Sequence, residues 1–155
     1  MDKLTKAAEA GDWACTLDLL DGRAQADALM GPIRGYQRHY ERSWAGTDFA
    51  LVFMRAQKLG HPDAARTATI THWLTRIAVA TRDTQEINSL HNNLTYWAGL
   101  NLAAIGTVVH RGDLVNEGVA RVREGIRDIG PHGELQRELK RGDRALHDHT
   151  FAPLP

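Results

Sequence analysis

The stretch that decides the fold is Asn93 to Val109, which reads NLTYWAGLNLAAIGTVV. Apolar residues occupy nearly every side of this segment, with Asn101 and Thr107 as the polar exceptions. A helix that is apolar all round is typical of a protein interior, because it offers no polar face to water. The sequence therefore predicts a central helix against which the rest of the chain packs.

Helical signals continue on both sides of this segment. Upstream, apolar residues recur at helical spacing from Pro62 to Ala80, behind a proline suited to a first helical turn. Downstream, Asp113 is expected to cap a helix that closes at Gly130-Pro131. One face of that helix is apolar and carries Val115, Val119, Val122, Ile126 and Ile129.

Weaker signals predict the remaining elements. A short helix with a basic polar face is expected from Glu134 to about Leu146. Towards the N-terminus we expect helices near Leu4 to Leu20, Ile33 to Trp44 and Phe49 to Leu59, with breaks at Gly22, Gly31, Gly46 and Gly60. No run alternates apolar and polar residues as a strand would. The predicted class is all-α, built of stacked antiparallel helical hairpins in one domain, residues 1–155.

Composition excludes several classes of function. Nineteen basic and nineteen acidic residues cancel, so no global field favours nucleic acid or a membrane surface. Cys15 is the only cysteine, and no Cys/His spacing resembles a metal site, so we expect neither a metal nor another cofactor. Neither an apolar leader nor an eighteen-residue apolar run occurs, which predicts a cytoplasmic protein as the chain is written.

Two polar motifs carry the functional signal. The first runs from Asn92 to Gly99 and pairs two amides with a Tyr-Trp step, and the second is a basic run from Glu138 to Phe151 that includes His149. Amides and guanidinium groups can hold a carboxylate, while planar rings can lie against a sugar ring. The residue types therefore suit an acidic polysaccharide.

Together the motifs resemble those of the alginate lyase superfamily, in particular the poly(β-D-mannuronate) lyases. An Asn-Asn-His-x-x-Trp pattern in that family is matched at Asn92, Asn93 and Trp97. Its later Glu-Leu-Lys-Arg-x-x-Arg-Ala-Leu-x-x-His-x-Tyr-Ala pattern is matched from Glu138 to Ala152. The matched residues of the second pattern are Glu138, Leu139, Lys140, Arg141, Arg144, Ala145, Leu146, His149 and Ala152.

The resemblance implies a partial α/α toroid and a periplasmic or secreted location. It also implies β-elimination, in which a base takes the C5 proton of a uronate and the C4–O4 bond breaks. Neutralising the carboxylate is the first requirement, and we assign it to the Asn93 amide and the Arg144 guanidinium. Substrate binding is assigned to a further set of residues. This set is Asn92, Tyr96, Trp97, Lys140 and Arg141.

Two positions depart from the family pattern. Its histidine falls on Leu94 and its tyrosine on Phe151, and neither of these side chains can move a proton. His147 and His149 are the favoured substitutes, with Tyr96 and His91 as the other nearby candidates. If either histidine takes over the proton transfer of the tyrosine, the chain is expected to be an active lyase.

Simpler interpretations stay open. Asn93 could cap the central helix, Trp97 could be a core residue, and Glu134 or Glu138 could pair with Lys140 or Arg144 as solvated charges. The chain could accordingly be an inactive uronate-binding remnant of the same fold, or a helical-hairpin interaction protein without a sugar ligand. An open toroid would expose helix faces, so a homodimer is expected under each interpretation.

Overall fold

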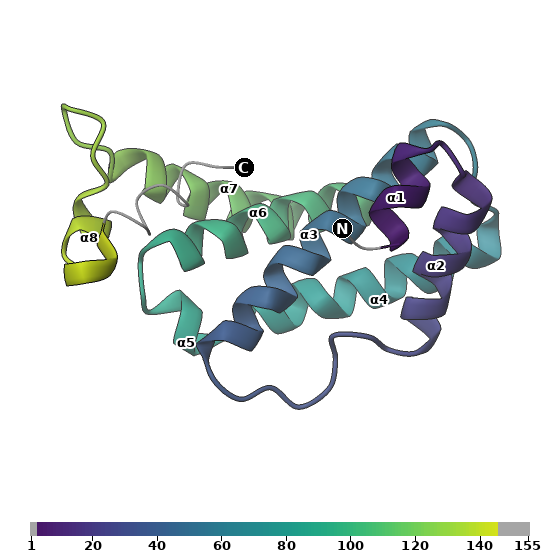
Figure 1. Cartoon of the computed structure of the whole chain (residues 1–155), viewed down its shortest axis with the longest axis horizontal. Coiled ribbons are helices and arrows are strands. Elements are labelled where there is room, and N and C mark those ends of the chain that lie inside the picture. Colours follow the sequence, from purple (N-terminus) through teal and green to yellow (C-terminus); the bar gives the residue numbers. More distant parts are fainter. Residues whose placement is uncertain (1–2, 146–155) are drawn as a thin grey trace.

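The structure, a computed structural model, describes residues 3–145, apart from the side chains of Tyr36, Gln85, Glu86 and Arg144. Helices dominate the described residues, and none of these residues lies in a β-strand (Figure 1). In chain order the elements are α1 (Lys3–Glu9), α2 (Trp13–Gln25), α3 (Tyr36–Lys58), α4 (Ala64–Arg82), α5 (Gln85–Asn88), α6 (Asn93–Val108), α7 (Gly112–Arg127), α8 (Gln136–Leu139) and the 3₁₀ helix η1 (Gly142–Arg144). The predicted all-α class is confirmed.

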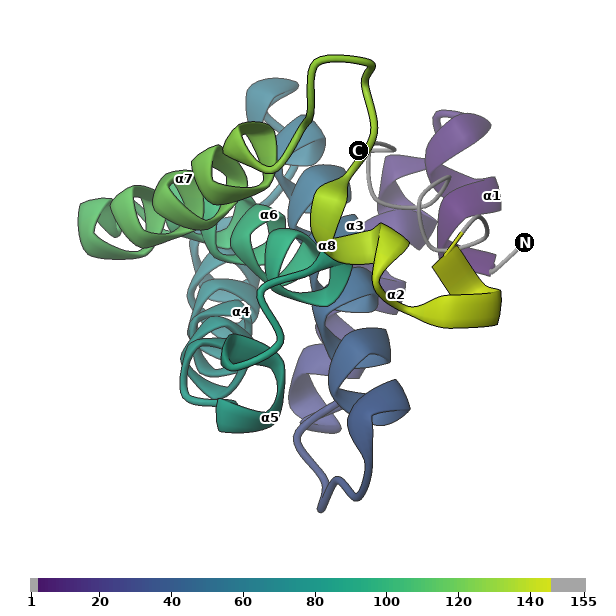
Figure 2. The ribbon, with the colours of Figure 1, turned by 90° about the vertical axis from the view of Figure 1, so that its left-hand side faces the viewer.

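The long helices form antiparallel pairs. Helices α3 and α4 run in opposite directions, as do α6 and α7, so the chain returns repeatedly to the same two ends (Figure 1). Figure 2 shows α6 near the centre, between α7 on one side and α3 and α4 on the other. Helix α6 contacts all three of them, which confirms the predicted central position of residues 93–109.

The core lies mainly where α3, α4 and α6 meet. Trp73 is its largest fully buried side chain, and its indole Nε1 donates a hydrogen bond of 2.7 Å to the carbonyl of Ala28. This bond attaches the loop after α2 to the core. The other fully buried large side chains are Phe53, Leu4, Leu17, Leu20, Ile70, Leu74, Ile77, Ile87, Leu102, Ile105 and Leu114.

Gly46 does not break a helix as predicted, because α3 continues through it from Tyr36 to Lys58. A Cβ at Gly46 would lie 2.7 Å from Ile77 Cγ2 and 2.8 Å from Asn101 Nδ2. The glycine therefore allows close packing of α3 against α4 and α6. Beside it, the buried Asn101 Nδ2 donates to the carbonyl of Ser43 at 2.9 Å.

Helices α6 and α7 approach each other through glycines. A Cβ at Gly118 of α7 would lie 2.5 Å from the Gly99 carbonyl oxygen of α6, and one at Gly125 would lie 2.9 Å from the Tyr96 ring. The α7 residues that are buried are Leu114, Gly118 and Gly125. The predicted apolar face is only partly covered: Val115, Val119 and Val122 are half-buried, whereas Ile126 and Ile129 at its end are 61% and 49% exposed.

Several predicted boundaries differ from the structure. The segment expected as one helix from Leu4 to Leu20 is two helices, because Gly11 turns the chain at φ 72° and Asp12 caps α2. Helix α2 then continues through Gly22, which was expected to break it. Pro62 precedes the α4 cap, Asp63, and so lies outside the first turn.

The C-terminal elements also differ from the expectation. Asp113 lies in the first turn of α7, and Arg111 occupies the cap position instead. Helix α7 ends at Arg127, three residues before Gly130. The helix expected from Glu134 to Leu146 is, within the described residues, two short pieces: α8 ends at Leu139, and η1 begins at Gly142, which adopts φ 62°. Among residues 3–145, no helix combines the length and apolar composition that crossing a bilayer requires.

Candidate functional site

The candidate site lies at the N-terminal end of α6. Asn92 caps the helix in an extended conformation, and its side-chain oxygen accepts a hydrogen bond of 3.1 Å from the Leu94 amide. The capping role that was considered for Asn93 therefore belongs to Asn92. Asn93 is the first helical residue, so its side-chain amide is not used for capping.

Asn93 contacts a segment that follows it by more than forty residues. Its backbone N–H donates to Glu138 Oε1 of α8 at 2.6 Å, and its side-chain Oδ1 accepts from Arg141 Nη1 at 3.2 Å. Arg141 Nη1 also donates to Glu138 Oε2 at 3.1 Å. Figure 2 shows α8 in front of the N-terminal end of α6. The two sequence motifs thus meet directly.

Burial makes this contact unusual. Glu138 is fully buried at 0% exposure and Asn93 is 4% exposed. An unpaired charge in such a position would be costly, so the ion pair with Arg141 and the bond from a helix N-terminal amide are needed to keep the carboxylate there. A solvated ion pair was one of the simpler interpretations left open for Glu138. Its full burial excludes that interpretation and places Glu138, the first residue of the second motif, in the site.

A second set of contacts holds the turn before α6. His91 adopts a left-handed φ of 50°, and its carbonyl accepts hydrogen bonds from the Tyr96 hydroxyl and from Arg137 Nη1, each at 3.2 Å. The His91 ring lies 2.8 Å from Glu124, which also pairs with Arg137. Residues on α6, α7 and α8 therefore fix the backbone that leads into Asn93.

The pKa values of this cluster follow from its surroundings. Burial raises the pKa of the Tyr96 phenol above its ordinary value. Burial also opposes ionisation of Glu124, but hydrogen bonds from Arg137 and His91 outweigh it and hold the pKa of Glu124 below its ordinary value. Tyr96 is therefore a neutral hydrogen-bond donor to the main chain, with its ring against Gly125.

Trp97 belongs to an aromatic cluster between α3 and α6. Its ring meets Trp44 edge to face at 5.6 Å between centroids, and Trp44 lies 4.1 Å from Tyr40. The indole nitrogens of Trp44 and Trp97 are buried without a hydrogen-bond partner among the described residues. The contact with Trp44 agrees with the packing interpretation, while Trp97 is half-buried and its predicted substrate-binding role stays a prediction.

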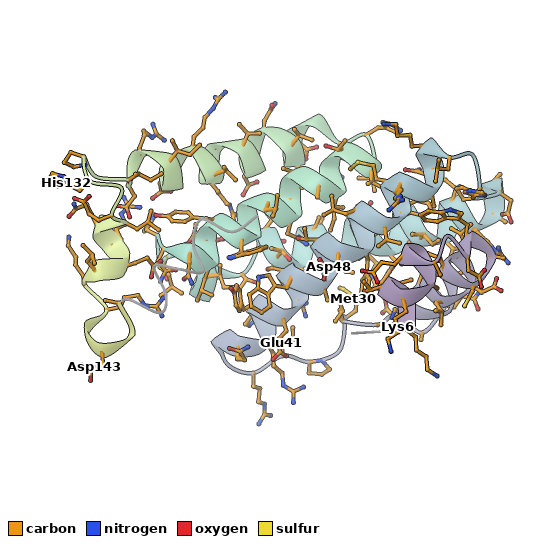
Figure 3. All side chains as sticks on the ribbon, turned by 45° about the horizontal axis from the view of Figure 1, so that its top comes forward. Lys6, Met30, Glu41, Asp48, His132 and Asp143 are labelled. Atoms are coloured by element: carbon orange, nitrogen blue, oxygen red, sulfur yellow. The ribbon has the colours of Figure 1, made fainter. Side chains whose placement is uncertain are left out.

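The remaining predicted site residues are placed only in part. Lys140 is exposed, and Leu94 is half-buried beside Asn93. The backbone of Arg144 closes η1, three residues after Arg141, while its side chain, together with His147, His149 and Phe151, lies outside the described residues. Figure 3 shows His132 and Asp143 at this same end of the molecule, His132 on the loop before α8 and Asp143 in η1 after it.

The sequence offered one signal for Glu138, since this residue opens the second motif. Leu135, three residues earlier, is apolar, and in the structure it is buried. Arg137 and Glu124 had no comparable signal, because their contact with His91 depends on how α7 returns along α6. The described residues hold no group of three or more His, Cys, Asp and Glu side chains arranged for a metal ion.

Comparison with known proteins identifies the family. The sequence profile described as alginate lyase matches residues 1–155. The chain belongs to the alginate lyase family. It is 32% identical over 145 residues to a polysaccharide lyase of Stenotrophomonas maltophilia, and 33% identical over 148 residues to an alginate lyase of Pseudomonas putida W619. These matches cover 91% of this chain but 43% and 40% of the relatives.

Solved structures agree with this alginate lyase assignment. Alginate lyase A1-III complexed with tetrasaccharide superimposes with a TM-score of 0.79 at 26% identity, over 89% of this chain and 39% of that one. A second structure, of alginate lyase A1-III from Sphingomonas species A1, gives a TM-score of 0.78. These proteins have an α/α toroid fold, which confirms both the predicted resemblance and the predicted fold. The chain spans about two fifths of their length.

Proposed function

We propose that this alginate lyase family protein acts on alginate or polymannuronate as a polysaccharide lyase, by β-elimination. The observation that carries the proposal is the direct contact between the two motifs, in which Arg141 and Glu138 hold Asn93 at the start of a buried helix. Family membership supplies the acidic polysaccharide as the class of substrate. The amide of Asn93 and the guanidinium of Arg141 are groups that suit such a ligand, and the carboxylate of Glu138 holds both of them in place.

The chemistry begins with the uronate carboxylate. While it is ionised, the neighbouring C5 proton is weakly acidic, so hydrogen-bond donors and a cation must stabilise the charge that develops on it. We assign this task to the Asn93 amide and the Arg144 guanidinium. A base then removes the C5 proton, a C4–C5 double bond forms as the C4–O4 bond breaks, and an acid protonates the leaving oxygen.

The proton carrier is assigned by considering each candidate. Tyr96 is buried and its hydroxyl already donates to the His91 carbonyl, while the His91 ring is paired with Glu124. Leu94 cannot take part. We therefore assign the proton transfers to His147 and His149, of which His149 matches a family position.

A second candidate function is binding without cleavage. Leu94 favours it, because an aliphatic side chain lies next to Asn93 at the position where the family pattern has histidine. In this case the chain would hold oligouronates through Asn93 and Arg144 but would not break them.

A cleavage assay separates the two functions. Mannuronate-rich alginate is incubated with the purified chain from acidic to alkaline pH, and the ultraviolet absorbance of the unsaturated product is followed. A lyase gives a rising signal that is lost in Arg144→Ala. The binding function instead predicts no signal, oligomannuronate binding that Arg144→Ala weakens, and cleavage that appears in the double variant Leu94→His, Phe151→Tyr. Absence of both cleavage and binding in the unmodified chain would refute both functions.

Two further expectations remain predictions. The exposed Ile126 near the end of α7 and Ile129 just after it support the expected homodimer, which sedimentation over a range of concentrations would test. The location of the protein, cytoplasmic as the chain is written or periplasmic or secreted as in the family, is open to cell fractionation.

A further inference from the structure

The Asn93 amide is held in one orientation by its partners. A guanidinium group donates hydrogen bonds and cannot accept them, so the side-chain atom that faces Arg141 must be the carbonyl oxygen of Asn93. The amide nitrogen Nδ2 then points away from Arg141. Among the described residues, none accepts a hydrogen bond from Nδ2, and this atom is not among the buried unpaired polar atoms.

Arg141 is itself held by Glu138. A single nitrogen, Nη1, carries two hydrogens and uses them for Asn93 Oδ1 at 3.2 Å and Glu138 Oε2 at 3.1 Å. The other oxygen of Glu138 accepts the backbone N–H of Asn93 at 2.6 Å. The hydrogen bonds among these three residues form a ring, which fixes both the backbone and the side chain of Asn93.

We infer that Glu138 and Arg141 are positioning residues that present the Nδ2 amide of Asn93 to the carboxylate of a bound uronate. The inference rests on the proposed function. It changes the role of Arg141 from binding the substrate directly to positioning Asn93. Its charge is balanced by the buried Glu138, so Arg141 acts on the substrate through Asn93 and not as the carboxylate's own cation.

The inference predicts a specific pattern of affinities. Without Arg141, the Asn93 amide can rotate and turn its carbonyl oxygen towards the anionic ligand, which repels it. Loss of one hydrogen bond to a charged group corresponds to a weakening of about tenfold to a hundredfold. Arg141→Gln should therefore weaken oligomannuronate binding by that factor, and Glu138→Gln should do the same. Arg123→Gln, which removes an exposed guanidinium from α7, is the matched control and should leave binding unchanged.

A double-mutant cycle tests whether Arg141 acts through Asn93. Oligomannuronate affinity is measured by calorimetry for the unmodified chain, Arg141→Gln, Asn93→Ala and the double variant. We expect the Arg141 effect to disappear once Asn93 is alanine, because no amide remains to be oriented. An effect of equal size in the Asn93→Ala background would overturn the inference, since Arg141 would then contact the ligand itself.

A ligand-free measurement keeps the inference separate from the proposed function. The side-chain N–H resonances of Asn93 are assigned in a nitrogen-15 spectrum by their loss in Asn93→Ala. We expect one sharp pair in the unmodified chain and in Arg123→Gln, and a broadened or doubled pair in Arg141→Gln. An unchanged pair in Arg141→Gln would refute the orientation. If the chain binds no oligouronate, the proposed function fails, and this spectrum alone decides the orientation of the amide.

Discussion

Replacing Gly118 of α7 by alanine should destabilise the protein, although the same change usually stabilises a helix. The added Cβ would lie 2.5 Å from the Gly99 carbonyl oxygen and 2.6 Å from the Ala103 amide nitrogen. Ordinary contacts begin near 3.4 Å, so the facing backbones must separate by close to one ångström. Both atoms belong to the main chain of α6, which cannot move without shifting its other contacts.

The magnitude follows from two opposing contributions. Overpacking of a buried contact costs about 1–3 kcal/mol, and the rigid backbone on the far side places Gly118→Ala towards the upper end. The better helix propensity of alanine returns about 1 kcal/mol. We therefore expect a net loss of about 1–2 kcal/mol in the free energy of unfolding. With a urea dependence of about 2 kcal/mol per molar, the unfolding midpoint should fall by about 0.5–1 M.

Urea unfolding followed by circular dichroism measures this shift. Gly22→Ala is the matched control, because Gly22 also lies within a helix but a Cβ there would meet nothing within 4 Å. It should raise the midpoint by about 0.5 M, from helix propensity alone. A Gly118→Ala midpoint equal to or above that of the unmodified chain would refute the argument that backbone contact holds α6 and α7 together.

Two other predictions concern single interactions. Trp73→Phe removes the bond from Nε1 to Ala28 and leaves a cavity, so it should cost about 1–3 kcal/mol in urea unfolding, and a loss below that range would contradict the importance of this bond. The hydrogen bond from Arg111 lowers the pKa of Asp113 from 3.8 to about 2, so its stabilisation is present above about pH 4 and is lost as the pH falls through about 2. Asp113→Asn should therefore lower the urea midpoint near pH 5 but not near pH 2, and a constant difference would contradict the pairing.

The elements that could be predicted from sequence are those with a local signal. Residues 93–109 are apolar on every side and therefore form the central helix wherever the rest of the chain lies. Gly46 and Gly118 show where local signals mislead. A glycine in a helical pattern indicates either a break or a close contact, and only the facing helix decides which. The face of α7 that packs most tightly on α6 was not apparent for the same reason, because Gly118 and Gly125 allow a closer contact than the branched residues beside them.

The sequence indicated several residues of the candidate site but not the contacts that each of them makes. The motifs predicted that Asn93 and Arg144 converge on one pocket, and this stays a prediction because the Arg144 side chain lies outside the described residues. The structure instead brings Arg141, which the sequence assigned to substrate binding, into contact with Asn93. For Glu138 a solvated ion pair stayed open as an alternative, because charged residues on short helices usually are exposed. Its burial depends on the return of the chain along α7 to the start of α6, and the apolar Leu135 nearby does not by itself indicate that path.

The equal lengths of α6 and α7, sixteen residues each, have an evolutionary consequence. The pair carries the chain out from Asn93 and back again, so that Glu138 arrives within 2.6 Å of its starting point. Inserting one residue into α7 would rotate everything after it by about 100° and advance it by about 1.5 Å. Insertions should therefore be tolerated at the distal turn near His110, where both helices can lengthen together, and selected against within either helix alone.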